Sequence, residues 1–505
     1  MKTRNKKNKI VPLLADGYKA GHFAQMDSVS HMYETYISRK TNKLDGFGDK
    51  ITWNIAVGMQ MAIKKIVDDF DEYFFERDKN IVIAEFREYL ADYLIIDESE
   101  VPTAHWEQLH DLGHLPIRIK AIPEGTVLPL GIPIMSFENT HPDFAWLPGW
   151  LETIITNKTW YSITCATVAM AYKRIAVKYA NDTCDNLDHI PFQCHDFGFR
   201  GNAGEEAAVM SDLGHIVNFL GSDTMATIPE MKYYYNANKG ISHSIYATEH
   251  STMETFGDTI KALRYFMNNP YKEKNGKPIS FSCVWDTWDY YGDLARLPEV
   301  KDEICARLGK VVIRPDSGDP VKIVCGDPEA EEGSIERIGT MQHLWNIFGG
   351  STNSKGYKVL DPHIGLIYGD AITLERAEEI LRKLKEAGFA ASNIVFGIGA
   401  KAYVCNTRDT LSIATKANYC VQNGTGKAIF KQPKTDSTKK SLKGLSAVIV
   451  EDGKYVVKDQ LSKDAYNSIK EQDQLKEVFV DGIFVKEYDL YEIRKTVEDG
   501  FKKYL

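Results

Sequence analysis

The spacing of hydrophobic residues changes along the chain. Between residues 50 and 100, the stretch ITWNIAVGMQMAIKKIVDDF places apolar residues on one helical face, which predicts helices in this region. Residues 115–137 instead consist of short β-rich runs broken by proline and glycine, and they predict strands in an antiparallel or mixed arrangement. Residues 161–181 again have the pattern of a helix. The first part of the chain is therefore expected to mix helices and strands.

From about residue 190, short apolar runs end in polar, glycine-rich corners. FQCHDFGFRG precedes the helical EEAAVMSDLGHIVNFLG, and the later runs are FSCVWDTWD, VVIRPDSGD, HIGLIYGDA and NIVFGIGA. LERAEEILRKLKEAG, between the last two runs, is an amphipathic helix with a glycine stop. Strands that alternate with helices indicate a parallel α/β array. Several such units favour a barrel, with an open sheet as the alternative, and ligands of such barrels bind at the carboxyl ends of the strands.

The C-terminal part of the chain is expected to contain strands. Strand-like pieces, YVVKD and VFVDGIFVKEY, occur after residue 400. We therefore expect an α/β fold.

Charge and cysteine content narrow the classes of function. The 505 residues carry a formal net charge of −9, which argues against nucleic acid as the main partner but permits a small anionic substrate. No run of about 18 apolar residues is present, so we expect no membrane span. The eight cysteines form no C-x-x-C pair, and no apolar segment follows the basic MKTRNKKNKI. These features predict a cytoplasmic protein with free thiols.

The polar corners contain residue types that suit a phosphorylated sugar. Arginine and histidine can pair with pyrophosphate oxygens, aspartate accepts hydrogen bonds from sugar hydroxyls, and glycine lets backbone amides approach a phosphate. The corner residues are Arg200, Asp223, His250, Asp286, Arg314, Asp316, Gly369, Asp370, Gly397 and Gly399. Each alone has a plainer interpretation. RPDSG suits a helix-capping turn, His250 a hydrogen-bonded buried residue, Phe197 the core, and KQPKTDSTKKSLKG a solvated loop.

Taken together, these motifs resemble the nicotinamide phosphoribosyltransferase family. The resemblance covers most of the chain in order and rests on LLADGYKAGHF, GHLPIRIKAIPEG, WYSITCAT, HDFGFRG, GSDT, ATEHST, VVIRPDSGDP, NSKGYK, IYGD, TRD, NGTGKAIFKQPK and YEIRK. It implies an irregular α/β barrel of the type II phosphoribosyltransferase kind over residues 151–399, which would carry the active site. An α+β domain built from both chain ends, residues 1–150 with 400–505, is implied as well. It also implies transfer of phosphoribosyl from phosphoribosyl pyrophosphate to nicotinamide, which gives nicotinamide mononucleotide and pyrophosphate for NAD salvage.

The resemblance assigns roles to individual residues. Phe197 and Tyr18 of the other subunit would sandwich the pyridine ring, while Asp223 would accept a hydrogen bond from the substrate amide. His250, Arg314 and Asp316 would be catalytic, with His250 also the phosphorylated histidine. The remaining substrate-binding residues implied are Arg200 at the pyrophosphate, Ser244 and Ser282 in the ring pocket, Gly369 and Asp370 at the ribose, Gly399, Ala400 and Arg408 at the 5′-phosphate, Arg39, Lys416 and Lys431 facing phosphates across the dimer, and Asp16 and Asp286.

Partners and cofactors follow from the same resemblance. It implies a homodimer with shared active sites, Mg²⁺ carried by the substrate, and ATP as an activating co-substrate, with no nucleic acid or membrane partner. Because phosphate oxygens would carry most of the Mg²⁺ contacts, the chain need not show a dedicated metal site, and the sequence does not identify metal ligands. Two positions depart from the family pattern: Phe199 stands where tyrosine is usual, and GIGAK is poorer in glycine than the usual phosphate loop, with Lys401 adding a charge. Nicotinate as the substrate, or a non-catalytic signalling protein on the same scaffold, are the alternatives.

Overall fold

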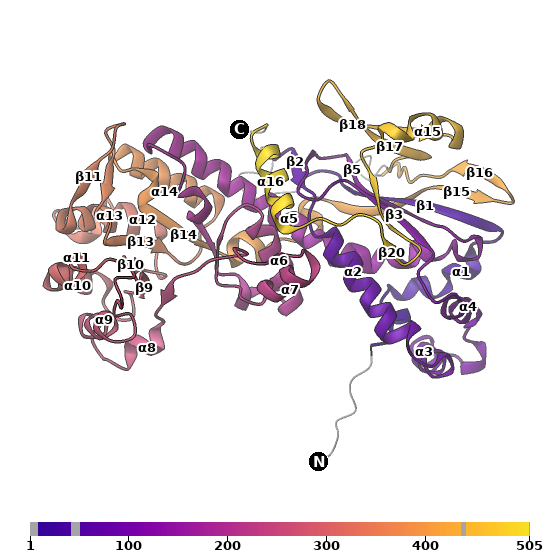
Figure 1. The fold of residues 1–505 in the computed structure, drawn as a ribbon, viewed down its shortest axis with the longest axis horizontal. Helices are drawn as coiled ribbons and strands as arrows, with labels where there is room; N and C mark the ends of the chain where they lie inside the picture. The colour runs from indigo at the N-terminus through magenta and orange to yellow at the C-terminus, as the bar shows by residue number, and fades with distance from the viewer. Residues whose placement is uncertain (1–8, 42–50, 436–440, 504–505) are drawn as a thin grey trace, which may run out of the picture.

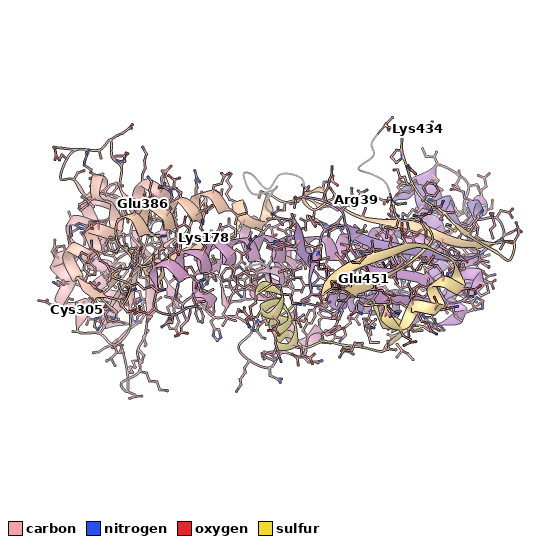
Figure 2. All side chains as sticks on the ribbon, turned by 90° about the horizontal axis from the view of Figure 1, so that it is seen from above. Arg39, Lys178, Cys305, Glu386, Lys434 and Glu451 are labelled. Atoms are coloured by element: carbon pink, nitrogen blue, oxygen red, sulfur yellow. The ribbon has the colours of Figure 1, made fainter. Side chains whose placement is uncertain are left out.

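The computed structural model describes residues 9–41, 51–435 and 441–503. The molecule is elongated, with a parallel sheet at one end and an antiparallel sheet at the other (Figure 1). From above, Cys305 and Glu386 lie toward the first end, and Arg39 and Glu451 toward the second (Figure 2). Helix α5 (Leu147–Thr183) runs between the two ends. No helix among the described residues is long and apolar enough to cross a membrane.

The antiparallel sheet takes its strands from both ends of the chain. Its seven strands have the order β16-β15-β1-β5-β3-β19-β20. Their bounds are β1 Val29–Ser38, β3 Ile117–Ala121, β5 Pro133–Asn139, β15 Ile413–Gln422, β16 Thr425–Ala428, β19 Lys476–Val480 and β20 Ile483–Phe484. Strand β1 pairs antiparallel with both β5 and β15, so the N-terminal and C-terminal segments form one continuous sheet. The expected mixed α+β character of these segments is thereby confirmed.

Helices and smaller strand pairs surround this sheet. The helices are α1 His22–Gln25, α2 Met59–Phe70, α3 Lys79–Leu94, α4 Ala104–Leu112 and α15 Lys463–Ile469. The further strands are β2 Trp53–Ile55 with β4 Val127–Pro129, and β17 Leu445–Glu451 with β18 Lys454–Leu461. Helix prediction over residues 50–100 was wrong at Trp53–Ile55. Gly58 adopts a left-handed φ of 90° directly before α2 and separates the strand from the helix, a break that apolar spacing alone does not reveal.

The parallel sheet forms an irregular barrel. Its strands are β6 Cys194–Asp196, β7 Gly221–Ser222, β8 Tyr246–Ala247, β9 Phe281–Val284, β10 Val311–Arg314, β13 Ile364–Tyr368 and β14 Ile394–Ile398. The order β7-β6-β14-β13-β10-β9-β8 places the first strand beside the last. The remaining gap, between β7 and β8, is bridged by the pair Gly221 and His243. The predicted barrel is therefore confirmed.

Helices alternate with the barrel strands along the chain, as the strand–corner–helix pattern predicted. They are α6 Glu205–Ile216, α7 Thr227–Tyr234, α8 His250–Glu254, α9 Thr259–Asn268, α10 Tyr290–Ala295, α11 Lys301–Cys305, α12 Pro320–Cys325, α13 Ile335–Phe348 and α14 Leu374–Glu386, with a small hairpin of β11 Gly350–Thr352 and β12 Lys358–Leu360. Helix α14 begins at the capping hydroxyl of Thr373, and Gly388 with φ 78° follows its end.

Two hydrophobic cores share helix α5. Leu151 and Ile155 belong to the core beneath the antiparallel sheet, whereas Ala169 and Ile175 belong to the core of the barrel. Helix α16 (Leu490–Phe501), at the C-terminal end, packs into the barrel core through Leu490, Ile493 and Val497. The C-terminal α16 thus shares the barrel core with α5. The predicted domain edges at residues 150 and 400 stay a prediction.

Candidate active site

Two adjoining cavities open at the carboxyl ends of the barrel strands. The larger, of about 460 Å³, is lined by Phe197, Phe199, Arg200, Asp223, Thr224, Arg314, Asp316, Gly369 and Asp370. The second, of about 250 Å³, is mostly apolar and is lined by Phe192, His195, Phe197, Asp223, His243, Ser244, Ile245, Ala247, Ser282, Val312, Arg314, Ile367 and Val395. Phe197, Asp223 and Arg314 line both, so a flat apolar ring and a charged group would meet at this junction.

Phe197 is held at the junction by its own backbone and by a glycine. Its N–H donates to the carbonyl of Ile398 at 2.7 Å. A Cβ added to Gly397 would lie 2.4 Å from the Phe197 ring, so only glycine at this position lets the ring lie against strand β14. Phe197 lines both cavities instead of being plain core, and one face of a planar ligand could stack on it.

Asp223 is a carboxylate with two donors already in place. His195 Nε2 lies 2.9 Å from Asp223 Oδ1, and the Ser244 hydroxyl donates to the same oxygen at 2.6 Å. Burial alone would raise the pKa of Asp223, but these hydrogen bonds and the charges of His195 and Arg314 lower it overall. Asp223 is therefore ionised near neutral pH and can accept a hydrogen bond from a ligand N–H.

Ser282 offers a second polar group to the apolar cavity. Its hydroxyl is buried on strand β9 and has no hydrogen-bond partner among the described residues. An unpaired buried hydroxyl is unfavourable, and a ligand amide would satisfy it. Ser244 and Ser282 thus lie where the resemblance implied, although their contacts with a ligand stay a prediction.

Arg314 ends strand β10 and faces the larger cavity. Its Nη2 donates to the Thr248 carbonyl at 2.8 Å, while its buried Nε has no partner among the described residues. The following turn is fixed by the Tyr368 hydroxyl, which donates to the carbonyls of Ser317 and Gly318, each at 3.0 Å. The plainer interpretation of RPDSG as a helix-capping turn accounts for this turn but not for an arginine directed at a cavity.

His250, Asp286 and Asp316 converge beside Arg314. His250 Nε2 lies 3.3 Å from Asp316 Oδ1, and its Nδ1 lies 3.1 Å from the Thr287 hydroxyl. Burial and the nearby charge of Asp286 raise the pKa of Asp316. The charges of Arg314 and His250 lower this pKa, but the net shift is upward. His250 is half-exposed, with a side-chain exposure of 43%, so it is accessible to a ligand.

This trio also has the geometry of a cation site. One ligand atom from each of His250, Asp286 and Asp316 lies within 4.8 Å of the others. Asp286 Oδ2 accepts from the backbone N–H groups of Asp316 and Ser317 at 3.0 and 2.7 Å, but its buried Oδ1 has no partner among the described residues. A carboxylate oxygen left without a donor, next to a second carboxylate, fits a hard divalent cation.

The remaining corner residues lie around the same opening. Gly369 donates its N–H to the Pro315 carbonyl at 3.1 Å, and a Cβ there would come within 3.2 Å of Asp316. Gly399 packs on Gly198, where an added Cβ would lie 2.9 Å from the Gly198 backbone. The residues that the structure brings together at the barrel mouth are Phe197, Arg200, Asp223, Ser244, His250, Ser282, Asp286, Arg314, Asp316, Gly369, Asp370, Gly399 and Ala400.

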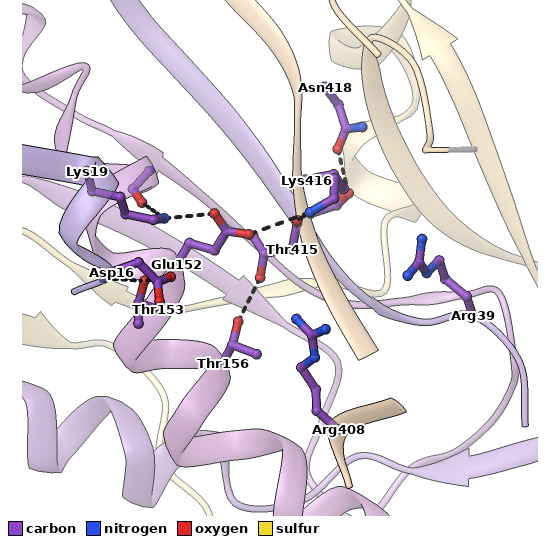
Figure 3. A network of polar contacts seen from close by, with 12 residues as sticks. Asp16, Lys19, Arg39, Glu152, Thr153, Thr156, Arg408, Thr415, Lys416 and Asn418 are labelled. Atoms are coloured by element: carbon purple, nitrogen blue, oxygen red, sulfur yellow. Dashed lines mark hydrogen bonds and ion pairs between the residues drawn. The ribbon is translucent and has the colours of Figure 1, made fainter. Parts of the chain in front are cut away.

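A second group of predicted residues lies elsewhere: Lys416 is on strand β15, Arg39 directly follows β1, and Asp16, Tyr18 and Arg408 lie in short turns. Figure 3 shows Asp16, Arg39, Arg408 and Lys416 in one region of the molecule. Tyr18 is 68% exposed, and its hydroxyl donates to Asp16 Oδ2 at 3.4 Å. Among the described residues that line the two barrel cavities, none belongs to this group. Lys431 is also exposed, and its N–H donates to the Ser441 hydroxyl at 2.9 Å.

Several contacting residues were absent from the candidate set. His195 and Thr224 line the cavities, and Thr287 contacts His250. His195 stands in the HDFGFRG motif, so its position at a strand end could have identified it. Thr287 carries no comparable signal, because its contact joins two loops that are separate in sequence.

The comparisons with known proteins agree with this architecture. The model of the nicotinate phosphoribosyltransferase (NAPRTase) family matches residues 192–483. A nicotinamide phosphoribosyltransferase of Acinetobacter baylyi is 39% identical over 98% of this chain and 99% of that protein. One of Xanthomonas campestris pv. campestris is 30% identical over 95% and 97%. The crystal structure of nicotinate-nucleotide pyrophosphorylase from Pyrococcus furiosus shares the fold, with a TM-score of 0.58 and 16% identity over 100% of this chain and 99% of that one. The chain belongs to the nicotinate phosphoribosyltransferase (NAPRTase) family.

Proposed function

We propose that this protein transfers phosphoribosyl from phosphoribosyl pyrophosphate to nicotinamide, giving nicotinamide mononucleotide and pyrophosphate. The observation that carries the choice of substrate is the ionised Asp223 at the junction of an apolar cavity with a cavity lined by charged residues. The two near full-length relatives named above are nicotinamide phosphoribosyltransferases. An enzyme that joins a pyridine ring to a phosphorylated sugar needs one apolar and one charged compartment, and the barrel mouth has both.

Binding begins with the ring in the apolar cavity. Phe197 would stack on one face of nicotinamide, and Asp223 would accept a hydrogen bond from its amide. The ring nitrogen is neutral and nucleophilic at pH 7, so no strong general base is required. Holding it in line with C1 of the ribose converts two freely diffusing reactants into an oriented pair.

The difficult step is the cleavage of the bond between C1 and pyrophosphate. The ring nitrogen forms the new bond to C1, and pyrophosphate leaves with the electron pair of the broken C–O bond. Arg200 and Arg314 face the cavity where this negative charge grows, and a fixed guanidinium stabilises it without reorganisation. Asp316 and Asp370 line the same cavity and would accept hydrogen bonds from the ribose hydroxyls.

Magnesium fits the same place. Asp286 and Asp316, with His250 beside them, would hold Mg²⁺ against the pyrophosphate, because one Asp286 oxygen is buried without a donor. When bound there, the cation would neutralise the charge of the leaving group. The protein's own part is to orient these carboxylates: the backbone amides of Asp316 and Ser317 fix the other oxygen of Asp286.

We further propose a homodimer in which each site takes residues from both chains. Tyr18 and Arg408 are exposed, Arg39 and Lys416 are half-buried, and all four lie outside the cavities of their own chain. In the partner's site, an exposed tyrosine could stack on the second face of the pyridine ring, and the cations could pair with phosphate oxygens. Buried free thiols, such as those of Cys165, Cys194 and Cys283, support a cytoplasmic location.

ATP coupling through a phosphohistidine would use His250. It is accessible, and Thr287 and Asp316 contact its two ring nitrogens. In the presence of ATP the yield of mononucleotide should rise, and a His250→Ala protein should lose that response. An unchanged ATP response in the variant would contradict this role.

The reaction itself is tested by incubating the protein with phosphoribosyl pyrophosphate and magnesium and offering nicotinamide or nicotinate separately. Chromatography of the products should show mononucleotide from nicotinamide. Product from nicotinate alone would leave the fold in place and overturn the substrate. No product from either, with ATP also present, would favour a non-catalytic protein on this scaffold.

A further inference from the structure

Lys19 is a buried cation next to an exposed aromatic ring. Its side chain is 1% exposed, whereas the neighbouring Tyr18 is 68% exposed. A buried ammonium is unfavourable unless it is paired and hydrogen-bonded. Lys19 Nζ donates to the Gly149 carbonyl and, at 2.8 Å, to Glu152 Oε2, and both acceptors lie in the first turns of α5. Lys19 therefore ties the segment that carries Tyr18 to the long central helix.

The other side of Tyr18 is tied to the same helix. The Thr153 hydroxyl donates to Asp16 Oδ2 at 2.8 Å, and the Asp16 N–H approaches the Thr153 Oγ1 at 3.4 Å. Figure 3 shows these contacts beside that of Lys19 with Glu152. Because residues 16 and 19 are both fixed on α5, the short helical turn between them presents Tyr18 in one place.

Glu152 also reaches the sheet. Its Oε1 lies 3.6 Å from Lys416 Nζ on β15, so one carboxylate lies between Lys19 and Lys416 (Figure 3). Glu34, on the adjacent strand β1, is fully buried near this cluster, and burial raises its pKa to about 8. Glu34 is thus mostly neutral at pH 7, which leaves Glu152 as the negative partner of both lysines.

We propose that Lys19 and Glu152 are positioning residues that hold Tyr18 and Lys416 in one preformed arrangement for the active site of the partner chain. This inference rests on the proposed shared active site. Neither residue needs to touch a substrate. Lys19 fixes the position of the segment that carries Tyr18 on helix α5. Glu152 sets the distance between that segment and Lys416 on β15.

Substrate kinetics distinguish positioning from a purely structural role. Tyr18→Ala should raise the KM for nicotinamide alone, and Lys416→Ala the KM for phosphoribosyl pyrophosphate alone. Glu152→Gln removes the negative charge that both lysines contact, so it should raise both KM values, each by about tenfold or more, since small misplacements are costly. A merely structural effect would lower the amount of active enzyme, and hence the apparent kcat, without moving either KM.

The same helix offers a matched control. Lys178, also on α5, pairs with Glu378 at 2.7 Å in an exposed ion pair, so Glu378→Gln should leave both KM values unchanged. Glu152→Asp keeps the charge and shortens the side chain, and it replaces Glu152→Gln if that variant does not fold. Wild-type KM values for both substrates in the folded variant would overturn the proposal.

Mixed dimers test whether Glu152 serves the other chain. A Glu152→Gln chain paired with an Arg314→Ala chain contains one intact site, made from the barrel of the first and the sheet of the second. Random mixing should recover about one quarter of wild-type activity. Recovery by Tyr18→Ala with Arg314→Ala, but none by Glu152→Gln with Arg314→Ala, would overturn the positioning role alone. Recovery by neither pair would overturn the shared site itself.

Discussion

His195 and Asp223 meet at the junction of the two barrel cavities, with His195 Nε2 2.9 Å from Asp223 Oδ1. The contact follows from the sheet register, because β6 and β7 pair in parallel and align His195 with Gly221. Asp223 leaves the end of β7 two residues later. The carboxylate is thus oriented before any ligand arrives, and a preoriented charge discriminates strongly between ligands that differ in charge.

Replacing Asp223 should therefore change substrate preference. In Asp223→Ser the amide of nicotinamide would lose its proposed acceptor, and the repulsion expected to oppose the carboxylate of nicotinate would disappear. The kcat/KM ratio of nicotinamide to nicotinate should fall by about tenfold or more, as for the loss of a hydrogen bond to a charged group. Steady-state kinetics with both substrates measure it, and an unchanged ratio would show that specificity arises elsewhere.

Gly397 should be intolerant of even one added methyl group. In Gly397→Ala the new Cβ would approach the Phe197 ring to 2.4 Å, so the ring must move away from strand β14. Because the ring forms one wall of the apolar cavity, the KM for nicotinamide should rise by about tenfold or more. The KM for phosphoribosyl pyrophosphate should rise less, because the contact of the new Cβ with the Gly369 Cα, at 2.9 Å, is the longer of the two. Equal increases in both values would indicate general disruption of the barrel instead.

Asp286→Asn should weaken the response to magnesium. The amide oxygen can still accept from the backbone N–H groups of Asp316 and Ser317, so the melting temperature should change little. The loss of the second oxygen should raise the Mg²⁺ concentration needed for half-maximal activity several-fold. Asp289→Asn is a matched control, since Asp289 caps helix α10 outside the cluster. An identical Mg²⁺ dependence of both variants would exclude Asp286 as a ligand.

Glu34 should make stability depend on pH. Its folded-state pKa of about 8 lies above its ordinary value of 4.5. Between these values the folded state keeps a proton that the unfolded state has released, so the contribution of Glu34 to stability falls as the pH rises through this window. Each pKa unit corresponds to about 1.4 kcal/mol.

Glu34→Gln removes this titration. The stability of the variant relative to wild type should therefore increase between about pH 5 and pH 8, by a few kcal/mol in total. Urea denaturation at several pH values measures the difference in the free energy of unfolding. A difference that stays constant over this range would contradict the raised pKa.

Much of the barrel mouth could be predicted from local patterns. Strand–corner–helix units imply parallel strands, and parallel barrel strands end on one side, so Arg314, Asp316 and Gly369 had to converge. The closure of the barrel through His243 could not be predicted, because a single bridging residue has no periodicity. The strand at Trp53–Ile55 was missed for a similar reason, since a run of only three residues, Trp, Asn and Ile, suits a helix equally well.

The second group of residues was accessible only through the family resemblance. Lys19 and Glu152 are separated by 133 positions, and nothing in ADGYK or in LPGWLE indicates that they pair. A lysine in a polar segment is ordinarily exposed, and only the packing of the N-terminal segment on α5 buries Lys19. Tertiary packing, which local sequence does not encode, creates this cluster.

A competition experiment tests the central claim most directly. The protein receives an equimolar mixture of nicotinamide and nicotinate with phosphoribosyl pyrophosphate and magnesium, and the two mononucleotides are quantified at low conversion. Their ratio equals the ratio of the two kcat/KM values. An ionised Asp223 beside Phe197 and Arg314 predicts almost exclusively nicotinamide mononucleotide. Nicotinate mononucleotide as the main product would contradict the account.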